Sequence, residues 1–453
     1  MVKIIAGGDA LYSSTNLKER IDPKIVKLLT ESDVAFLNAE FTTPKPTTPS
    51  AAGRGYLTSI KPHSLDDLLS LNFKLISFAN NHTVEFGHEG LVDTIEESEK
   101  RGIHPVGVGR SLEDAKKPQF FDSSTGRVGI VGASSTHSHI ALAASNGAHT
   151  PARAGLLPLR WTLSYVLPEE QYKQFEQIDI LLGTRKSMLE SARVEVRTGE
   201  VTGDDFFRFG HLFDSNLVVT KAKEGESAHV RTTANEIDLQ RLLRSVKDSS
   251  ERSNLPIFSL HTHEGDNNNW YNPIPPKFIQ KFARKTIDSG AKAFIGHGAH
   301  MLRGVEIYKG KPIFYNVGSF LMEFEPGESF IGPEMYEKYG LDPSTSLPSD
   351  LHNLRSYGPK GEAIGFRSGR KFSINILVEL EIDEDDEDSF RFKIIPIDLG
   401  LDTRQNKLKR GLPEWATNDV AKYITNYLEE NSAPWGTKFN YNEATGYISV
   451  LTA

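Results

Sequence analysis

The side chains of this chain that could do chemistry are histidines and carboxylates placed just after short apolar runs. His297 and His300 follow the apolar run Ala293–Ile295, from which Gly296 separates them. Two imidazoles on a loop with flanking glycines, where the backbone can approach a ligand closely, suit metal binding or acid–base chemistry. The alternative is a pair of ordinary histidines on a surface loop. The choice depends on whether other segments supply partners.

Such partners follow four other apolar runs. Carboxylates, an amide oxygen and neutral imidazoles together suit borderline divalent ions such as Zn, Mn, Fe or Co. The set is larger than one tetrahedral ion needs, so a two-metal site is open as well. The residues at the ends of the apolar runs are Asp9, Glu40, Asn81, His82, His261, His263, His297 and His300.

Apolar runs and helical periodicities alternate from the first residues to Val131. The runs Val2–Ala6, Val34–Leu37 and Phe73–Phe78 are predicted strands, and the segments between them are predicted helices. This alternation predicts right-handed crossovers and a largely parallel sheet, and therefore an α/β fold. Function in such sheets collects at the carboxyl ends of the strands, which is where the predicted partners lie.

The remainder of the chain shows a mixed pattern. Residues 134–226 lack a clear period and are predicted to form an insertion that shapes substrate access. Residues 323–371 are rich in Gly, Pro and Ser and are predicted to be loop. The other predicted elements are helices at 236–247, 276–289 and 419–431, strands at 256–260, 305–308, 312–317, 372–382 and 390–399, and a short hairpin near 436–450.

Composition limits the classes of function. The 453 residues include no cysteine, which excludes disulfides, thiolate metal sites and cysteine nucleophiles. A net charge of −8 offers no bulk attraction for a nucleic acid, so we expect no nucleic-acid partner. The chain begins directly with an apolar strand and has no stretch of 18 apolar residues. We therefore expect no signal peptide, no membrane span and a cytoplasmic location, while the oligomeric state stays unknown.

A series of short motifs runs through the first two thirds of the chain. The motifs are Gly7-Gly8-Asp9, Asn38-Ala39-Glu40, Ala79-Asn80-Asn81-His82, Phe86-Gly87, Glu89-Gly90-Leu91, Pro151–Arg160, Ser259–Gly265, Gly296–Gly304 and Val305–Phe320. Together they resemble the bacterial capsule-synthesis CapA family, also called the poly-gamma-glutamate biosynthesis family. The resemblance implies a metallophosphoesterase-like fold over residues 1–323, a four-layer α/β/β/α sandwich with the insertion at about 134–226. Residues 324–453 would form a C-terminal α+β extension with β-hairpins and a closing helix, packed on the core.

The resemblance also implies roles for individual residues. The metal site would hold one or two divalent ions, which could be Zn, Mn, Fe, Co or Ca. His82 would be the acid/base group near the substrate, and one of the neighbouring histidines would be its partner. We therefore predict catalytic roles for His82, His263 and His297, and metal ligation by Asp9, Glu40, Asn81, His261 and His300, with His297 as a further candidate ligand.

Several positions depart from the pattern of the relatives. Leu11 stands where metallophosphoesterases usually carry a histidine, and Glu40 replaces their metal-bridging aspartate. Gly298 and Ala299 stand where CapA relatives usually have His-Pro, and Ser319 replaces an asparagine. One imidazole is therefore missing, which leaves the number of metal ions open.

Three hypotheses follow. The first is an enzyme that acts on a peptide-like or γ-glutamyl substrate, by amide hydrolysis or by Cα epimerisation as in the related lasso-peptide epimerases. The second is a metal-dependent phosphoesterase, and the third is a non-catalytic component of polyglutamate or capsule synthesis. Under the first hypothesis, Arg153, Arg160 and Arg303 are candidates to bind a substrate carboxylate, with ordinary structural arginines as the alternative.

Overall fold

Two β-sheets stacked face to face form the centre of the computed structural model, which describes residues 1–51, 57–195, 201–210, 217–323, 331–383 and 385–451. The first sheet has ten strands in the order β21-β22-β19-β18-β1-β2-β3-β4, with β17 beside β1 and β20 beside β19. Its strands are β1 (Val2–Leu11), β2 (Val34–Ala39), β3 (Phe73–Ser77), β4 (His104–Val106), β17 (Ser319–Met322), β18 (Ile374–Asp383), β19 (Asp386–Asp398), β20 (Glu414–Trp415), β21 (Lys438–Asn442) and β22 (Tyr447–Leu451).

The second sheet has six strands in the order β15-β16-β14-β13-β7-β6. Parallel pairing joins β7, β13, β14 and β16, while β6 and β15 are antiparallel at the two edges. These strands are β6 (Gln119–Ser123), β7 (Gly126–Ser134), β13 (Leu255–Thr262), β14 (Ala293–Gly298), β15 (Val305–Tyr308) and β16 (Lys311–Phe314).

Side chains on alternating strand positions build the layers. In β1, Ile4 packs between the sheets while Ile5 packs against the helices on the outer face. In β13, Ile257 lies between the sheets and Phe258 lies under the helices of the other face. This period of two is expected for strands that are buried on both sides. The four-layer α/β/β/α sandwich predicted from the sequence is therefore confirmed.

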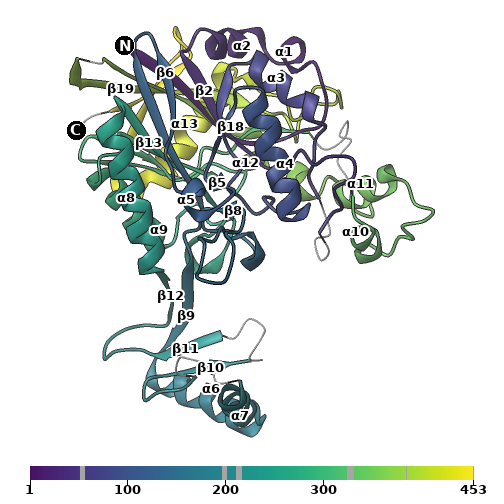
Figure 1. The fold of residues 1–453 in the computed structure, drawn as a ribbon, viewed down its shortest axis with the longest axis vertical. Helices are drawn as coiled ribbons and strands as arrows, with labels where there is room; N and C mark the ends of the chain where they lie inside the picture. Colours follow the sequence, from purple (N-terminus) through teal and green to yellow (C-terminus); the bar gives the residue numbers. More distant parts are fainter. Residues whose placement is uncertain (52–56, 196–200, 211–216, 324–330, 384, 452–453) are drawn as a thin grey trace.

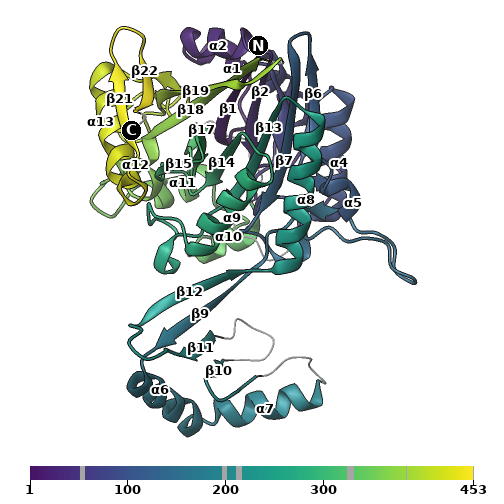
Figure 2. The ribbon, with the colours of Figure 1, turned by 90° about the vertical axis from the view of Figure 1, so that its left-hand side faces the viewer.

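Helices cover the outer face of each sheet, and Figures 1 and 2 show the layers from two sides. The helix α13 (Asn418–Ser432) adds Ala421, Ile424 and Leu428 to the core between the sheets. The covering helices are α1 (Leu17–Arg20), α2 (Pro23–Thr30), α3 (Leu65–Ser70) and α4 (Gly87–Lys100) on the first sheet, and α8 (Glu236–Arg252) and α9 (Lys277–Asp288) on the second.

The insertion predicted at about 134–226 stays a prediction in its bounds, and the described part of this region contains a small α/β lobe. Its sheet has the order β10-β11-β9-β12 and continues to Ala234. Figures 1 and 2 show β9 and β12 as an arm that carries the lobe away from the two sheets. Its elements are β9 (Trp161–Leu167), α6 (Glu169–Leu181), α7 (Thr184–Val194), β10 (Phe206–Phe209), β11 (Leu217–Lys221) and β12 (His229–Ala234). Its influence on substrate access stays a prediction.

The segment predicted as loop at 323–371 also contains helices in its described part. They are α10 (Pro333–Lys338), α11 (Pro348–Ser356) and, at the end of the segment, α12 (Arg370–Ser373). Pro333 and Pro348 occupy the starts of their helices, where proline is favourable because its missing N–H needs no partner. Proline, whose frequency led to the loop prediction, therefore lies at the start of a helix at both positions.

The strand β18 lies directly beside β1, so residues on both sides of position 323 share one sheet. The division of the chain into domains at that position stays a prediction. Within the described residues, no helix is both long and apolar enough to cross a membrane. The predicted cytoplasmic location is not tested by that finding.

Candidate metal centre

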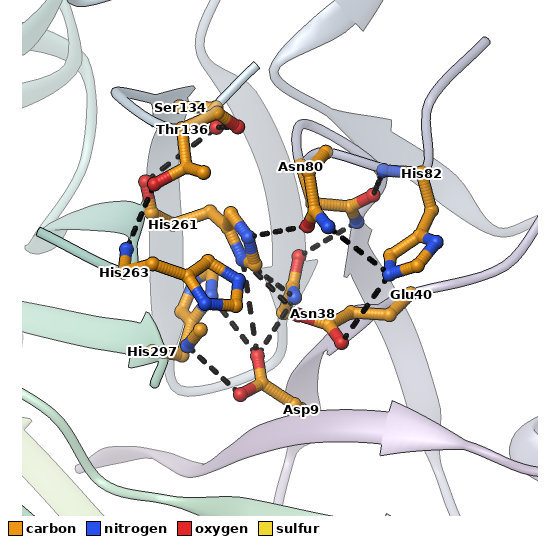
Figure 3. A network of polar contacts seen from close by, with 12 residues as sticks. Asp9, Asn38, Glu40, Asn80, His82, Ser134, Thr136, His261, His263 and His297 are labelled. Atoms are coloured by element: carbon orange, nitrogen blue, oxygen red, sulfur yellow. Dashed lines mark hydrogen bonds and ion pairs between the residues drawn. The ribbon is translucent and has the colours of Figure 1, made fainter. Parts of the chain in front are cut away.

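The predicted strand-end residues meet where the carboxyl ends of parallel strands from the two sheets converge (Figure 3). Asp9 lies near the end of β1, and Glu40 follows β2. His261 and His297 lie side by side on the neighbouring strands β13 and β14, in register with each other. Stacking of the two sheets therefore brings carboxylates from one sheet against imidazoles from the other.

Asp9, His261 and His297 form a first group of possible metal ligands. One ligand atom from each lies within 4.8 Å of the others. Asp9 Oδ1 is 3.4 Å from His297 Nδ1 and 4.0 Å from His261 Nδ1. All three side chains are completely buried. We call this set the Asp9 group.

Glu40, His263 and His300 form a second group of the same size, again with one ligand atom each within 4.8 Å. Glu40 Oε2 is 3.4 Å from His300 Nε2, and the imidazole centroids of His263 and His300 are 5.7 Å apart. We call this set the Glu40 group. Asp9 Oδ2 lies only 3.1 Å from His300 Nδ1, so the two groups adjoin each other.

Hydrogen bonds from neighbouring residues hold the first group in place. Asn38 Nδ2 donates to Asp9 Oδ1 at 2.9 Å, and the backbone N–H of Gly298 donates to Asp9 Oδ2 at 2.8 Å. Ser259 Oγ lies 2.7 Å from His297 Nε2, which leaves Nδ1 facing Asp9. Asn81 Oδ1 lies 2.8 Å from His261 Nε2, so this predicted ligand contacts an imidazole of the group. Such secondary contacts orient ligands before any ion binds.

The protonation of the centre suits metal ligation. Burial, together with the nearby imidazole of His263, holds the pKa of His261 well below its usual range. Burial and the neighbouring His300 do the same for the pKa of His263. Burial raises the pKa of Asp9, but hydrogen bonds and charges from His297 and His300 outweigh it and leave that pKa well below its usual range. These shifts favour neutral imidazoles at His261 and His263 and an ionised carboxylate at Asp9.

Two buried nitrogen atoms test whether these residues fit a metal ion. His263 Nε2 is buried and has no hydrogen-bond partner among the described residues, and the buried His297 Nδ1 faces the Asp9 carboxylate at 3.4 Å. A buried polar atom left in that state costs about 1–3 kcal/mol, so native proteins rarely tolerate it without a ligand. The donor set of imidazole nitrogens and carboxylate oxygens is the one that borderline divalent ions prefer. The residues fit a divalent metal ion.

His82 lies beside the Glu40 group and belongs to neither group. Its Nδ1 is 2.7 Å from Glu85 Oε1, and its Nε2 is 4.0 Å from Glu40 Oε2. Asn81 Nδ2 lies 3.2 Å from the same Nε2, which fits an Nε2 atom that accepts. The side chain of His82 keeps 11% of its surface exposed, whereas those of His261 and His297 are 0% exposed. The side chain of His82 is therefore partly exposed, as is that of His300 at 8%.

The three predicted substrate-binding arginines lie in other surroundings. Arg153 is exposed and its Nε donates to the backbone oxygen of Leu142. Arg160 makes two hydrogen bonds from its guanidinium to Asp238. Arg303 is fully buried and donates to the backbone oxygens of His263, Glu264 and Trp270. Arg303 thus fixes the loop that carries His263, and the role of all three in substrate binding stays a prediction.

Sequence reasoning missed several supporting residues. Asn38 lies at the end of β2, two positions before Glu40, and Glu85 lies three positions after His82. Their positions beside predicted site residues were the available signal. Ser259 gave a signal too, since it lies two positions before His261 and so points to the same side of β13.

Comparisons with known proteins match the part of the chain that carries the centre. The model of the family described as "Bacterial capsule synthesis protein PGA_cap" matches residues 4–323. The uncharacterized protein y4sH of Sinorhizobium fredii is 28% identical over 456 residues, which span 99% of this chain and 93% of that protein.

More distant matches carry functional names. The PGA biosynthesis protein CapA of Bacillus subtilis is 22% identical over 294 residues, which span 64% of this chain and 54% of that protein. A solved structure described as a novel phosphatase from Mycoplasma pneumoniae aligns with a TM-score of 0.37 at 12% identity, over 88% of this chain and 93% of that chain.

Proposed function

Since the chain belongs to the bacterial capsule synthesis protein family PGA_cap, we propose that it is a metal-dependent enzyme that hydrolyses an amide bond in a peptide-like or γ-glutamyl substrate. The observation that carries the proposal is the pair of adjoining three-ligand groups at one buried point. Clusters of buried ionisable groups with strongly shifted pKa values are concentrated at functional sites. A non-catalytic component of polymer synthesis would have less use for such a cluster.

In this proposal the two groups hold one divalent ion each, of zinc, manganese, iron, cobalt or calcium. The Asp9 group and the Glu40 group supply three side chains each, and Asn81 orients His261. A divalent ion held there supplies Lewis acidity toward a substrate carbonyl. The role of the chain itself is to keep the imidazoles of His261 and His263 neutral, to exclude bulk water and to place an acid/base group.

His82 is the proposed acid/base residue. Glu85 fixes its Nδ1, so the imidazole presents Nε2 toward the side of the centre that substrate can reach. In amide hydrolysis, water adds to the carbonyl carbon and gives one proton to His82 Nε2, the C–N bond breaks, and His82 delivers that proton to the departing amine nitrogen. This assignment is consistent with its partial exposure.

If the centre holds two ions, the other four imidazoles act as metal ligands. His82 is then the single histidine of the centre that remains for proton transfer. Hydrolysis needs one such group, whereas Cα epimerisation needs a base on one face of the carbon and an acid on the other. If only one group held an ion, an imidazole of the other group could act with His82, and epimerisation would become the better proposal. The number of ions therefore separates the two reactions.

The test uses metal-loaded protein and a γ-glutamyl peptide in deuterated water. Release of a free amine supports hydrolysis, and deuterium at Cα in an intact peptide supports epimerisation instead. His82→Gln should lower kcat by about 10²–10⁴-fold while metal content stays unchanged. His149→Gln serves as the matched control, because it removes an exposed histidine that lies far from His82 in the sequence. Equal activity of both variants would remove His82 from the mechanism.

A phosphoesterase is the second candidate, because two adjoining ions can also clamp the attacking and leaving oxygens of a phosphoester. Both candidates place the ions at the same two groups. A chromogenic phosphate ester distinguishes them. Turnover of that ester without amine release from the peptide would favour the phosphoesterase, and a metal-loaded protein that leaves the ester intact would disfavour it.

A further inference from the structure

The imidazole of His263 is held differently from the other imidazoles of the centre. Each of the others has a ring nitrogen within hydrogen-bonding distance of a polar side chain, in the pairs His82–Glu85, His261–Asn81, His297–Ser259 and His300–Ser319. Among the described residues, by contrast, nothing forms a hydrogen bond with the ring of His263. A hydrogen bond to the second ring nitrogen normally orients a metal-binding imidazole, so the orientation of His263 must be set in another way.

The backbone of His263 is held on both sides of its Cα atom. Its N–H donates to Thr136 Oγ1 at 2.8 Å, a contact that Figure 3 shows. Its carbonyl oxygen accepts from Nη2 of the fully buried Arg303 at 2.9 Å. Since backbone geometry sets the direction of Cβ, these two contacts determine where the side chain leaves the chain. The ring of Trp270 then packs against the imidazole, with centroids 4.7 Å apart.

Glu264 controls the orientation of the Thr136 hydroxyl. Its Oε1 accepts from Thr136 Oγ1 at 2.8 Å. Its Oε2 accepts from Ser135 Oγ at 2.6 Å and from Thr262 Oγ1 at 2.8 Å. A hydroxyl has a single proton, so once Thr136 donates it to the carboxylate, its oxygen is left to accept from the N–H of His263. Glu264, which is buried and belongs to neither group of ligands, thus joins the loop after β7 to the loop after β13.

We propose that Glu264 is a positioning residue that acts through Thr136 to place His263 as the third ligand of the Glu40 group. The proposal rests on the proposed function, because it assumes that this group holds an ion. Glutamine at position 264 keeps the volume but exchanges an acceptor oxygen for an NH2 donor, so at least one hydroxyl loses its acceptor. The loop that carries His263 then loses part of its support.

The Asp9 group depends less on Glu264. His261 lies within β13, where pairing with β7 and β14 fixes its backbone, and its Nε2 lies 2.8 Å from Asn81 Oδ1. His263 lies beyond the end of that strand and has neither support. Loss of the Glu264 carboxylate therefore predicts a selective loss of one ion, which a general weakening of the fold would not produce.

The test measures manganese binding to the full chain by calorimetry, together with the metal content of each folded variant. Thr136→Val removes the hydroxyl at nearly constant volume, and this variant and Glu264→Gln should each weaken one of the two binding steps about 10–100-fold. The other step should stay unchanged. Thr136→Ser keeps the hydroxyl and should bind like the wild type. Thr425→Val is the matched control, because it removes a buried hydroxyl that donates within α13.

A second readout needs no metal. It is the nuclear magnetic resonance signal of the His263 ring in the metal-free full chain with labelled histidines. That signal should shift in Thr136→Val and in Glu264→Gln and stay in place in Thr425→Val. Circular dichroism identifies a variant that does not fold, and one folded variant of the first two is sufficient for the test.

Equal weakening of both binding steps, full affinity of a folded Thr136→Val, or the same loss in Thr136→Ser or Thr425→Val would overturn the positioning role. A wild type that binds no metal would contradict the proposed function instead, and the ring signal then decides. A shift confined to Thr136→Val and Glu264→Gln would support the positioning role, and an unchanged signal would overturn it.

Discussion

At the scale of single residues, the sequence predicted the members of the centre better than their grouping. Strand-end positions predicted that Asp9, Glu40 and the histidines form one site, but they did not show that the carboxylates and the imidazoles come from two stacked sheets. His263 was predicted as catalytic, and that role stays a prediction; its imidazole lies with Glu40 and His300. Which residues share a group depends on the direction of each side chain and on the loop that Arg303 holds in place. The sequence motifs show neither.

Gly298 lies where the backbone conformation and the surrounding atoms favour glycine. Its φ of 114° favours glycine, and a Cβ there would lie 3.0 Å from His261 Cε1. Its N–H instead donates to Asp9, and His263 brings the Glu40 group to three ligands without a further imidazole on this loop.

Gly298→Ala should therefore destabilise the protein and reduce metal binding. We expect a loss of about 1–3 kcal/mol in the free energy of unfolding, from backbone strain and the shift of His261. Denaturant unfolding and metal titration measure the two effects. Gly310→Ala is the matched control, because Gly310 has a φ of 72° but open space around the added Cβ. Equal metal binding by both variants would contradict the role given to Gly298.

At the scale of elements, alternation of strands and helices was predictable and isolated polar helices were not. The helix α6 buries only Tyr172 and Asp179, so its sequence carries little periodic signal. The strands of the core are buried on both faces and show continuous apolar runs, which are easy to recognise. Prediction failed where an element has little apolar surface to bury.

The junction between the lobe and the core depends on Arg160 and Asp238. Asp238 lies in the first turn of α8 and is buried, and it accepts from the backbone N–H and the guanidinium of Arg160 just before β9. Burial raises the pKa of Asp238, but the hydrogen bonds and charge of Arg160 outweigh it and leave that pKa lowered. The ionised carboxylate therefore stabilises the folded state.

Asp238→Asn should lower the free energy of unfolding by about 1–3 kcal/mol near neutral pH. A lowered folded-state pKa means that the stabilisation is complete above the unfolded pKa of about 3.9 and is lost as pH falls through the folded pKa. The difference between wild type and variant should therefore shrink in acid, as followed by urea unfolding. Asp248→Asn, at an exposed pair with Arg252, should change stability by less than about 1 kcal/mol. A difference that does not depend on pH would contradict the ionic role.

At the scale of the whole molecule, the family and the layered fold were predictable from local patterns and motifs. The position of the C-terminal strands in the sheet was not predictable. Pairing of β18 with β1 joins residues that are more than 370 positions apart along the chain. β18 contributes Ile376, Val378 and Leu380 to the core between the sheets. These contacts suggest that the C-terminal segment is required for folding.

A chain that ends at residue 323 should therefore be insoluble or lack a cooperative unfolding transition. Its β1 would become an exposed edge, and the apolar side chains that face β18 would meet water. Soluble expression followed by thermal unfolding measures this. A soluble truncated chain with a sharp transition would contradict the shared core and would support a separate domain up to residue 323.

The central claim is that Asp9, Glu40 and four histidines form a centre for two divalent ions. Its most direct test is the metal content of the folded chain after removal of metal with a chelator and reconstitution with excess manganese or zinc. The account predicts two ions per chain, one for each three-ligand group. A folded chain that retains fewer than two ions after removal of the excess would contradict the two-ion centre, and with it the assignment of amide hydrolysis.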